Sequence, residues 1–316
     1  MKYSGIGGQA VMEGIMMKNK DKYSVAVRKP DKEIEIKVEE DKGVIKNKTL
    51  KKIPIIRGVL NFLDSMVLGM KTLTYSADFF MEDEEKEKEE KKKGFFENIF
   101  KDKADSVVMG LTVCFSIVLA VGIFIMLPYF ISLFFQRFID SIMLVSVLEG
   151  LIRVTIFIIY IKLISMMNDI KRLFMYHGAE HKCINCIEHG MELTVENVRK
   201  SSKEHKRCGT SFLLIVMVIS IVFFMFIQVE SPIVRMVLRL ALVPVIAGVS
   251  YEFLRLAGRS DNCVINILSK PGLWLQNLTT KEPDDDIIEV GIASVEAVFD
   301  WREYLCENFG KEQGDL

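Results

Sequence analysis

Four long apolar stretches constrain the fold of this chain more than any other feature. They are Val107 to Phe135, Ile142 to Met167, Phe212 to Val229 and Ile233 to Leu256. The first two exceed the roughly 20 residues that a helix needs to cross the hydrocarbon core of a bilayer. Half of the 316 residues are apolar. We therefore predict a mainly α-helical, polytopic membrane protein with four transmembrane helices in two hairpins, at 107–167 and 212–256.

The fourth apolar stretch is the least regular of the set. Arg235 and Arg239 lie in its first turns, and Pro244 and Gly248 interrupt it. Proline removes a backbone hydrogen bond, and a broken helix at membrane depth needs other partners for its free backbone groups. We expect this helix to be kinked, tilted or partly re-entrant.

The distribution of positive charge predicts the orientation. Segment 168–211 contains eight Lys and Arg residues and segment 82–106 contains seven, whereas the two hairpin turns contain only Arg137. Because positively charged loops stay inside, both termini and the central loop are expected in the cytoplasm, beneath the cell membrane. Lys and Arg number 41 against 42 Asp and Glu, so the predicted partner is the lipid bilayer and not nucleic acid.

The remaining segments are polar and are expected outside the bilayer. In residues 1–52, alternation of apolar and polar residues around Pro30-Asp31 predicts a two-stranded hairpin that follows a glycine-rich turn. Segment 53–81 is predicted to form an amphipathic helix on the membrane surface, and 82–106 a charged linker. The C-terminal segment 257–316 is predicted to contain an amphipathic helix that begins after a run of acidic residues.

The central loop, 168–211, holds the most informative side chains, including all four His and three of the six Cys residues. If the second span continues as a helix into this loop, His177 and His181 project from one face and can share a metal ion, most naturally zinc. Glu180 is placed to act as a general base. The spacing His-x-x-Glu-His is that of the inverzincin metalloproteases.

Further ligand types follow in the same loop and beyond it. His205 and Cys208 precede the third span and can complete the metal site, as can a carboxylate such as Glu252. Cys183 and Cys186 allow a different arrangement, a closed zinc-knuckle-like site with a structural metal, or a redox dithiol. Histidines that only lie at the headgroup level are the alternative without a metal.

Charged residues inside the predicted spans form a second group. Glu149 and Arg153 lie four residues apart in the second span, as do Arg235 and Arg239 in the fourth. Ionisable groups at membrane depth are costly and usually pair with each other or line a wet cavity. We predict an interhelical pair between Glu149 and one of the two arginines of the fourth span. A polar pocket for a lipid headgroup or a solute is the alternative.

Several motifs, ordered along the whole chain, agree with one family. They are GGQAVMEG at 7–14, AVR at 26–28, RG at 57–58, AEHK at 179–182, LTVENVR at 193–199, RCGTSF at 207–212, PGLWLQ at 271–276 and LTTKEP at 278–283. Together they resemble the bacterial YqhQ family, multi-pass membrane proteins with a domain of unknown function that are often labelled metal-dependent enzymes. The resemblance implies functional roles for His177, Glu180, His181 and Cys208, with Gln9 and Glu13 as contributors.

Two classes of function follow from these observations. The first is a metal-dependent hydrolase at the cytoplasmic membrane surface, with zinc held by His177, His181, His205 and Cys208 and with Glu180 as base. The second is a non-enzymatic membrane protein with a structural metal site, acting in assembly, lipid binding or transport. The substrate and a homo-oligomeric state are left open by the sequence.

Overall fold

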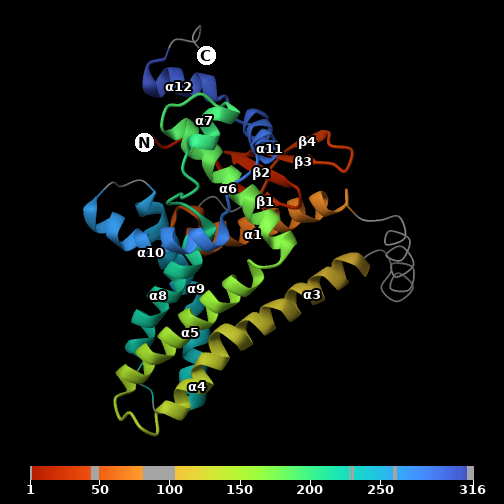
Figure 1. Ribbon diagram of the computed structural model, residues 1–316. Coiled ribbons are helices and arrows are strands. Elements are labelled where there is room, and N and C mark those ends of the chain that lie inside the picture. The colour runs from red at the N-terminus through yellow and green to blue at the C-terminus, as the bar shows by residue number, and fades with distance from the viewer. Residues whose placement is uncertain are drawn as a thin grey trace.

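A computed structural model describes residues 2–43, 50–80, 104–227, 229, 231–258 and 262–311. Long helices extend from one side of a body that combines a sheet with shorter helices (Figure 1). Most of the predicted charged linker at 82–106 lies outside the described residues.

The N-terminal region forms a four-stranded antiparallel sheet in the order β1-β2-β3-β4. The strands are β1 (Gly7–Val11), β2 (Gly14–Asn19), β3 (Lys22–Arg28) and β4 (Ile34–Glu40). The predicted hairpin is confirmed as β3 and β4, in which Arg28 pairs with Ile34. The prediction of only two strands is wrong. The glycine-rich segment forms a second hairpin, because it turns within two residues and Glu13 adopts a positive φ of 48°.

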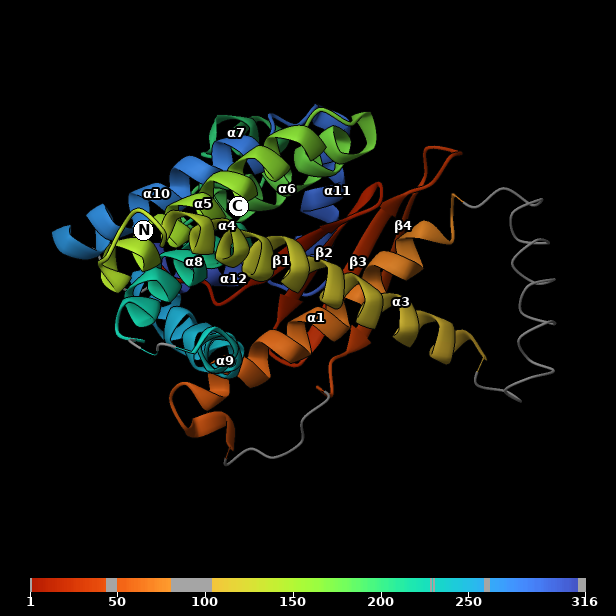
Figure 2. The ribbon, with the colours of Figure 1, turned by 90° about the horizontal axis from the view of Figure 1, so that it is seen from below.

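Both faces of the sheet are covered by helices. Alternate residues of a strand point to opposite faces, so Ile15 and Met17 pack with α6 (Asn168–Glu188) and α11 (Asp285–Glu296). Met16 and Val25 pack on the other face with Leu68 of α1 (Ile56–Ala77). Figure 2 shows the strands between α1 and the pair α6 and α11. The N-terminal sheet and the C-terminal helix therefore share one core.

Helix α1 matches the amphipathic helix predicted at 53–81. Its Leu68 and Thr72 are buried, whereas Leu63, Val67 and Met70 are largely exposed. A helix with one packed and one exposed apolar face suits a membrane surface. Its location on a bilayer stays a prediction.

Among the residues that the structure describes, three helical segments are long and apolar enough to cross a membrane. They are Gly110–Phe135, Ile142–Ile164 and Ile233–Ala257. The first comprises α3 (Ala104–Val121), a π-helical turn (Gly122–Met126) and α4 (Leu127–Phe135), and the others correspond to α5 (Ile142–Ile164) and α9 (Pro232–Ala257). Large apolar side chains on α3, such as Phe115 and Val118, are each 69% exposed to the surroundings of the protein. A lipid environment would cover them.

The prediction of four full spans is not met by the described residues. Helix α8 (Gly209–Met225) is apolar but has 17 residues, which at 1.5 Å per residue gives about 25 Å against a hydrocarbon core of about 30 Å. The sequence predicts that the fourth apolar stretch is the least regular one. The corresponding helix, α9, nevertheless runs through Pro244 as one helix of 26 residues. The short element is the third one instead.

The charged groups of the apolar helices form the predicted interhelical pair. Glu149 pairs with Arg239 of α9 and, at 2.8 Å, with Nη2 of Arg153 on its own helix. All three side chains are at most 5% exposed. Arg235 lies apart from them and donates to the backbone carbonyl of Val229 at 2.7 Å.

Four shorter elements complete the fold. They are a 3₁₀ turn (Leu50–Lys52), α7 (Val195–Lys200), α10 (Cys263–Thr279) and α12 (Trp301–Phe309). Helix α10 packs against α8, and the predicted C-terminal amphipathic helix is confirmed as α11.

Candidate metal centre

The second span does not continue into the central loop, although such a continuation was the condition under which His177 and His181 were expected on one helical face. Helix α5 ends at Ile164, Met167 has extended backbone angles, and a new helix, α6, begins at Asn168. The region predicted as a loop is therefore mostly helical. His177 and His181 lie on one face of α6, at the spacing of four residues that the prediction required.

Three side chains converge at the start of α8. His177, His181 and Cys208 each offer one ligand atom, and these atoms all lie within 4.8 Å of one another. Cys208 is the N-cap residue of α8, and its Sγ is 3.2 Å from Nε2 of His177. His181 and Cys208 are buried. We refer to these three residues as the His-His-Cys group.

Backbone carbonyls orient both imidazole rings. Nδ1 of His177 lies 2.9 Å from the carbonyl oxygen of Thr279, and Nδ1 of His181 lies 2.6 Å from that of Lys203. Because a carbonyl only accepts hydrogen bonds, each Nδ1 must carry the proton. In the neutral form of each ring the lone pair is then on Nε2. Metal-binding histidines are commonly held in this way.

The charges in the group favour a thiolate. Burial disfavours the charged form of Cys208, but His177 and His181 beside it hold the pKa of this thiol well below its usual range. Burial also disfavours the cationic form of His177, yet the neighbouring Cys208 outweighs this effect and raises the pKa of His177 to about 9. A thiolate with two imidazoles is a donor set that suits zinc.

Glu180 is buried beside the group. Burial raises the pKa of its carboxyl group, and His181 and His177 only partly offset that effect. The backbone of β1 runs directly over it, since a Cβ added to Gly8 would lie 2.9 Å from Cγ of Glu180. A glycine at this position is therefore needed for Glu180 to occupy its place. A carboxyl group with a raised pKa is a stronger proton acceptor than an ordinary one.

His205 lies outside the His-His-Cys group, although the sequence predicted it as a ligand. Its ring is 5.6 Å from the ring of His181, and its Nε2 faces Glu188 at 3.7 Å. Glu188 is fully buried, accepts from Nη2 of Arg207 at 2.6 Å and from the backbone of Ser4 at 2.9 Å. Although burial opposes its ionisation, His205 and Arg207 lower the pKa of Glu188 to about 2. His205 thus belongs to a neighbouring charged network.

The closed four-ligand site with Cys183 and Cys186 is not formed. Both thiols are buried in the core shared by the sheet, α6 and α11. Sγ of Cys183 lies next to Gly291 of α11, and Sγ of Cys186 is 3.2 Å from the carbonyl oxygen of Glu192. Successive turns of α6 point these side chains away from the His-His-Cys group. They act as small core residues.

The other predicted contributors also lie elsewhere. Gln9 points from β1 to α1, on the opposite face of the sheet from Glu180. Glu13 accepts hydrogen bonds from Arg172 at the start of α6, and Glu252 accepts one from Nε of Arg57 at 2.6 Å. Each carboxylate already has a cationic partner. Their positions indicate roles in joining elements.

Two buried polar residues that sequence reasoning did not single out position the site. Nζ of Lys182 donates to the carbonyls of Arg199 and Ser201, both at 2.9 Å, and so fixes the segment that leads to Lys203. Gln276 of α10 accepts from the backbone N–H of His205 at 2.8 Å. Lys182 lies in the motif AEHK and Gln276 lies in the motif PGLWLQ. These motifs were the sequence signal that could have identified both residues.

Gly178 is predicted to be intolerant of a side chain. A Cβ at this position would lie 2.0 Å from the carbonyl oxygen of Lys281, so Gly178→Ala must displace α6 or the segment after α10. We expect a loss of about 1–3 kcal/mol of stability, as for other overpacked sites, seen as a lower melting temperature in detergent. Gly110→Ala in α3 is the control because nothing lies within 4 Å of its Cβ. Equal melting of Gly178→Ala and wild type would contradict this contact.

Comparison with known proteins gives a family match but no activity. The family described as "Protein of unknown function (DUF1385)" matches residues 53–301. The "Uncharacterized protein YqhQ" of Bacillus subtilis (strain 168) is 36% identical over 295 residues, which cover 91% of this chain and 90% of the relative. No solved structure matches the chain.

Proposed function

The chain belongs to the DUF1385 family, whose function is unknown. From the residues of the chain itself, we propose that it is a membrane-bound, zinc-dependent hydrolase. The observation that supports this proposal is the His-His-Cys group, with both Nδ1 atoms held by carbonyls and Glu180 beside it. Zinc bound there would supply Lewis acidity. His177, His181 and Cys208 would hold the ion, and Glu180 would take a proton from the attacking water.

The number of ligands favours a catalytic over a structural metal. Structural zinc sites usually have four protein ligands, whereas catalytic sites have three and keep one position open. Within the described residues only three side chains form the group, and Cys183 and Cys186 are not among them. A zinc ion held by these three residues would keep one coordination position for water or substrate, and Glu180 lies beside the group.

A location at the membrane surface is supported by the connections of the site. Cys208 caps α8, and α6 begins four residues after α5 ends. The group is thus attached to the ends of apolar helices. We assign it to the cytoplasmic side because the positively charged segments lie at that end.

The test separates metal binding from catalysis. Purified wild-type protein is expected to contain about one zinc per chain. Glu180→Gln is expected to keep the metal, but its hydrolysis of a panel of chromogenic acyl and phosphate esters should be slower by about a hundredfold or more. Glu196→Gln, an exposed carboxylate on α7, is the matched control and should retain activity.

Three results would contradict the proposal. They are protein without stoichiometric metal, no hydrolysis of any ester in the panel by metal-loaded wild type, and equal turnover by wild type and Glu180→Gln. Stoichiometric metal without turnover would instead favour the non-enzymatic alternative, in which the metal only joins α6 to α8.

A further inference from the structure

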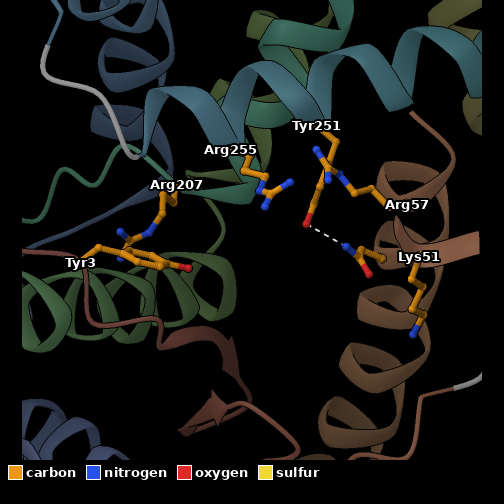
Figure 3. A pocket seen from close by; sticks show the side chains of 7 residues that line it. Tyr3, Lys51, Arg57, Arg207, Tyr251 and Arg255 are labelled. Carbon is orange, nitrogen blue, oxygen red and sulfur yellow. Dashed lines mark hydrogen bonds between the residues drawn. The ribbon is translucent and has the colours of Figure 1, made fainter. Parts of the chain in front are cut away.

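A cavity of about 320 Å³, lined by none of the three residues of the His-His-Cys group, lies at the end of α9 and the start of α1 (Figure 3). Its wall comes from five separate parts of the chain, which are the N-terminal segment, the 3₁₀ turn, α1, the residues before α8, and α9. The cations in this wall are Lys51, Arg57, Arg207 and Arg255. The other lining residues are two tyrosines and one asparagine. We call this cavity the basic pocket.

Every lining residue that the structure describes can donate a hydrogen bond, and none of them is acidic. Three of the four cations pair with a carboxylate that does not line the cavity: Lys51 with Asp64, Arg57 with Glu252 and Arg207 with Glu188. Arg255 forms no ion pair within the part of the chain that the structure describes. The wall therefore has an excess of positive charge facing the cavity, which favours an anion.

Arg207 is positioned in advance of any ligand. Its guanidinium stacks on the ring of Tyr3, 4.3 Å from the centroid, and its Nη2 donates to Glu188 at 2.6 Å. Figure 3 shows the stacked pair at one side of the cavity. Its Nη1 is buried and has no hydrogen-bond partner among the described residues. The carboxylate of Glu188 and the ring of Tyr3 therefore fix the Arg207 side chain before any ligand arrives.

Hydrogen bonds also hold the side chains of the opposite wall in place. Nδ2 of Asn61 on α1 donates to the hydroxyl oxygen of Tyr251 on α9 at 2.8 Å, the dashed bond in Figure 3. The tyrosine hydroxyl proton is then free to point to a second acceptor. Arg57 is fixed nearby by Glu252. Donors are thus held on both sides of one cavity.

The basic pocket lies where a membrane would place phosphate groups. Tyr251 and Arg255 are in the last two turns of α9, and α9 is long and apolar enough to cross a bilayer. The ends of a span lie at the level of the lipid headgroups, where basic pockets between helices bind anionic lipids. Arginine forks match the oxygens of phosphate. We propose that the basic pocket binds a phosphate group, from an anionic phospholipid or from a free phosphate compound.

The test uses full-length protein in nanodiscs with two probes. Inorganic phosphate is titrated calorimetrically in phosphatidylcholine discs, and phosphatidic acid is titrated by native mass spectrometry. We expect at least one probe to bind saturably to wild type, and Arg255→Gln to weaken it about tenfold or more, because a charge-assisted hydrogen bond is lost. Arg255→Lys should bind with intermediate affinity. Arg137→Gln, at the far hairpin turn, is the matched control and should bind as wild type.

The outcomes distinguish a soluble phosphate compound from a lipid headgroup, and they also test whether the basic pocket binds phosphate at all. Binding of inorganic phosphate indicates a soluble ligand, and binding of phosphatidic acid alone indicates a headgroup. Should Arg255→Gln not fold, wild type alone decides, because its melting temperature should rise in phosphate or phosphatidic acid relative to chloride at equal ionic strength. Absence of saturable binding and of this rise, or equal binding by folded Arg255→Gln, overturns the proposal. We expect Arg255→Gln to keep the zinc content of the wild type. The outcome for phosphate binding is therefore independent of the metal centre.

Discussion

Cys208→Ser and His181→Ala are each expected to purify without stoichiometric zinc. Both substitutions remove one of the three ligand atoms that lie within 4.8 Å, and loss of even an outer partner of a metal ligand costs 10–100-fold in affinity. Zinc affinity should therefore fall by more than about a hundredfold. Mass-spectrometric metal analysis after dialysis, and competition with a chromogenic chelator, measure this loss.

Each matched control replaces a residue of the same type at a position outside the His-His-Cys group. His189→Ala removes an exposed histidine at the end of α6, and Cys263→Ser removes an exposed thiol. Both variants should retain zinc. The pKa of Cys208 is lowered, so its thiolate persists at a pH where an ordinary thiol is protonated. Because bound zinc would occupy this thiolate, iodoacetamide should label Cys208 only after zinc is removed. Stoichiometric zinc in Cys208→Ser would rule out this ligand set.

Glu149→Gln is expected to cause the largest loss of stability in the apolar helices. Arg153 and Arg239 both pair with Glu149 in a place where all three side chains are almost fully buried. Removing the single carboxylate leaves two buried cations without a counter-charge, which costs about 3–5 kcal/mol. Thermal melting of the detergent-solubilised protein should show a strongly lowered transition, with zinc lost at the same temperature as the fold.

A triple variant provides the control for this prediction. Glu149→Leu combined with Arg153→Met and Arg239→Met removes every charge at once, and apolar replacement of a buried ionic group is often neutral or stabilising. The triple variant should therefore melt much closer to wild type than Glu149→Gln does. If Glu149→Gln alone melts like wild type, the three charges do not hold the helices together.

Patterns within one element were predictable from the sequence. The long apolar runs gave the positions of α3 to α5, α8 and α9, and alternation around Pro30 gave β3 and β4. Strands β1 and β2 were missed because Gly7, Gly8 and Gly14 interrupt their alternation and suggested a turn. Close packing requires glycine at two of these positions, since a Cβ on Gly8 would lie 2.9 Å from Cγ of Glu180 and one on Gly14 would lie 2.4 Å from the carbonyl oxygen of Ala26.

The sequence by itself determined only that His177, Glu180 and His181 would lie on adjacent turns if this segment were helical, because backbone geometry fixes the spacing of side chains within a helix. Only the tertiary structure decided that Cys208, and not His205, Cys183 or Cys186, joins the two histidines. Cys208 is 31 residues from His177, and the packing of α6, α8 and α10 brings them together. The basic pocket depends even more on packing, because its cations come from segments that no local pattern connects.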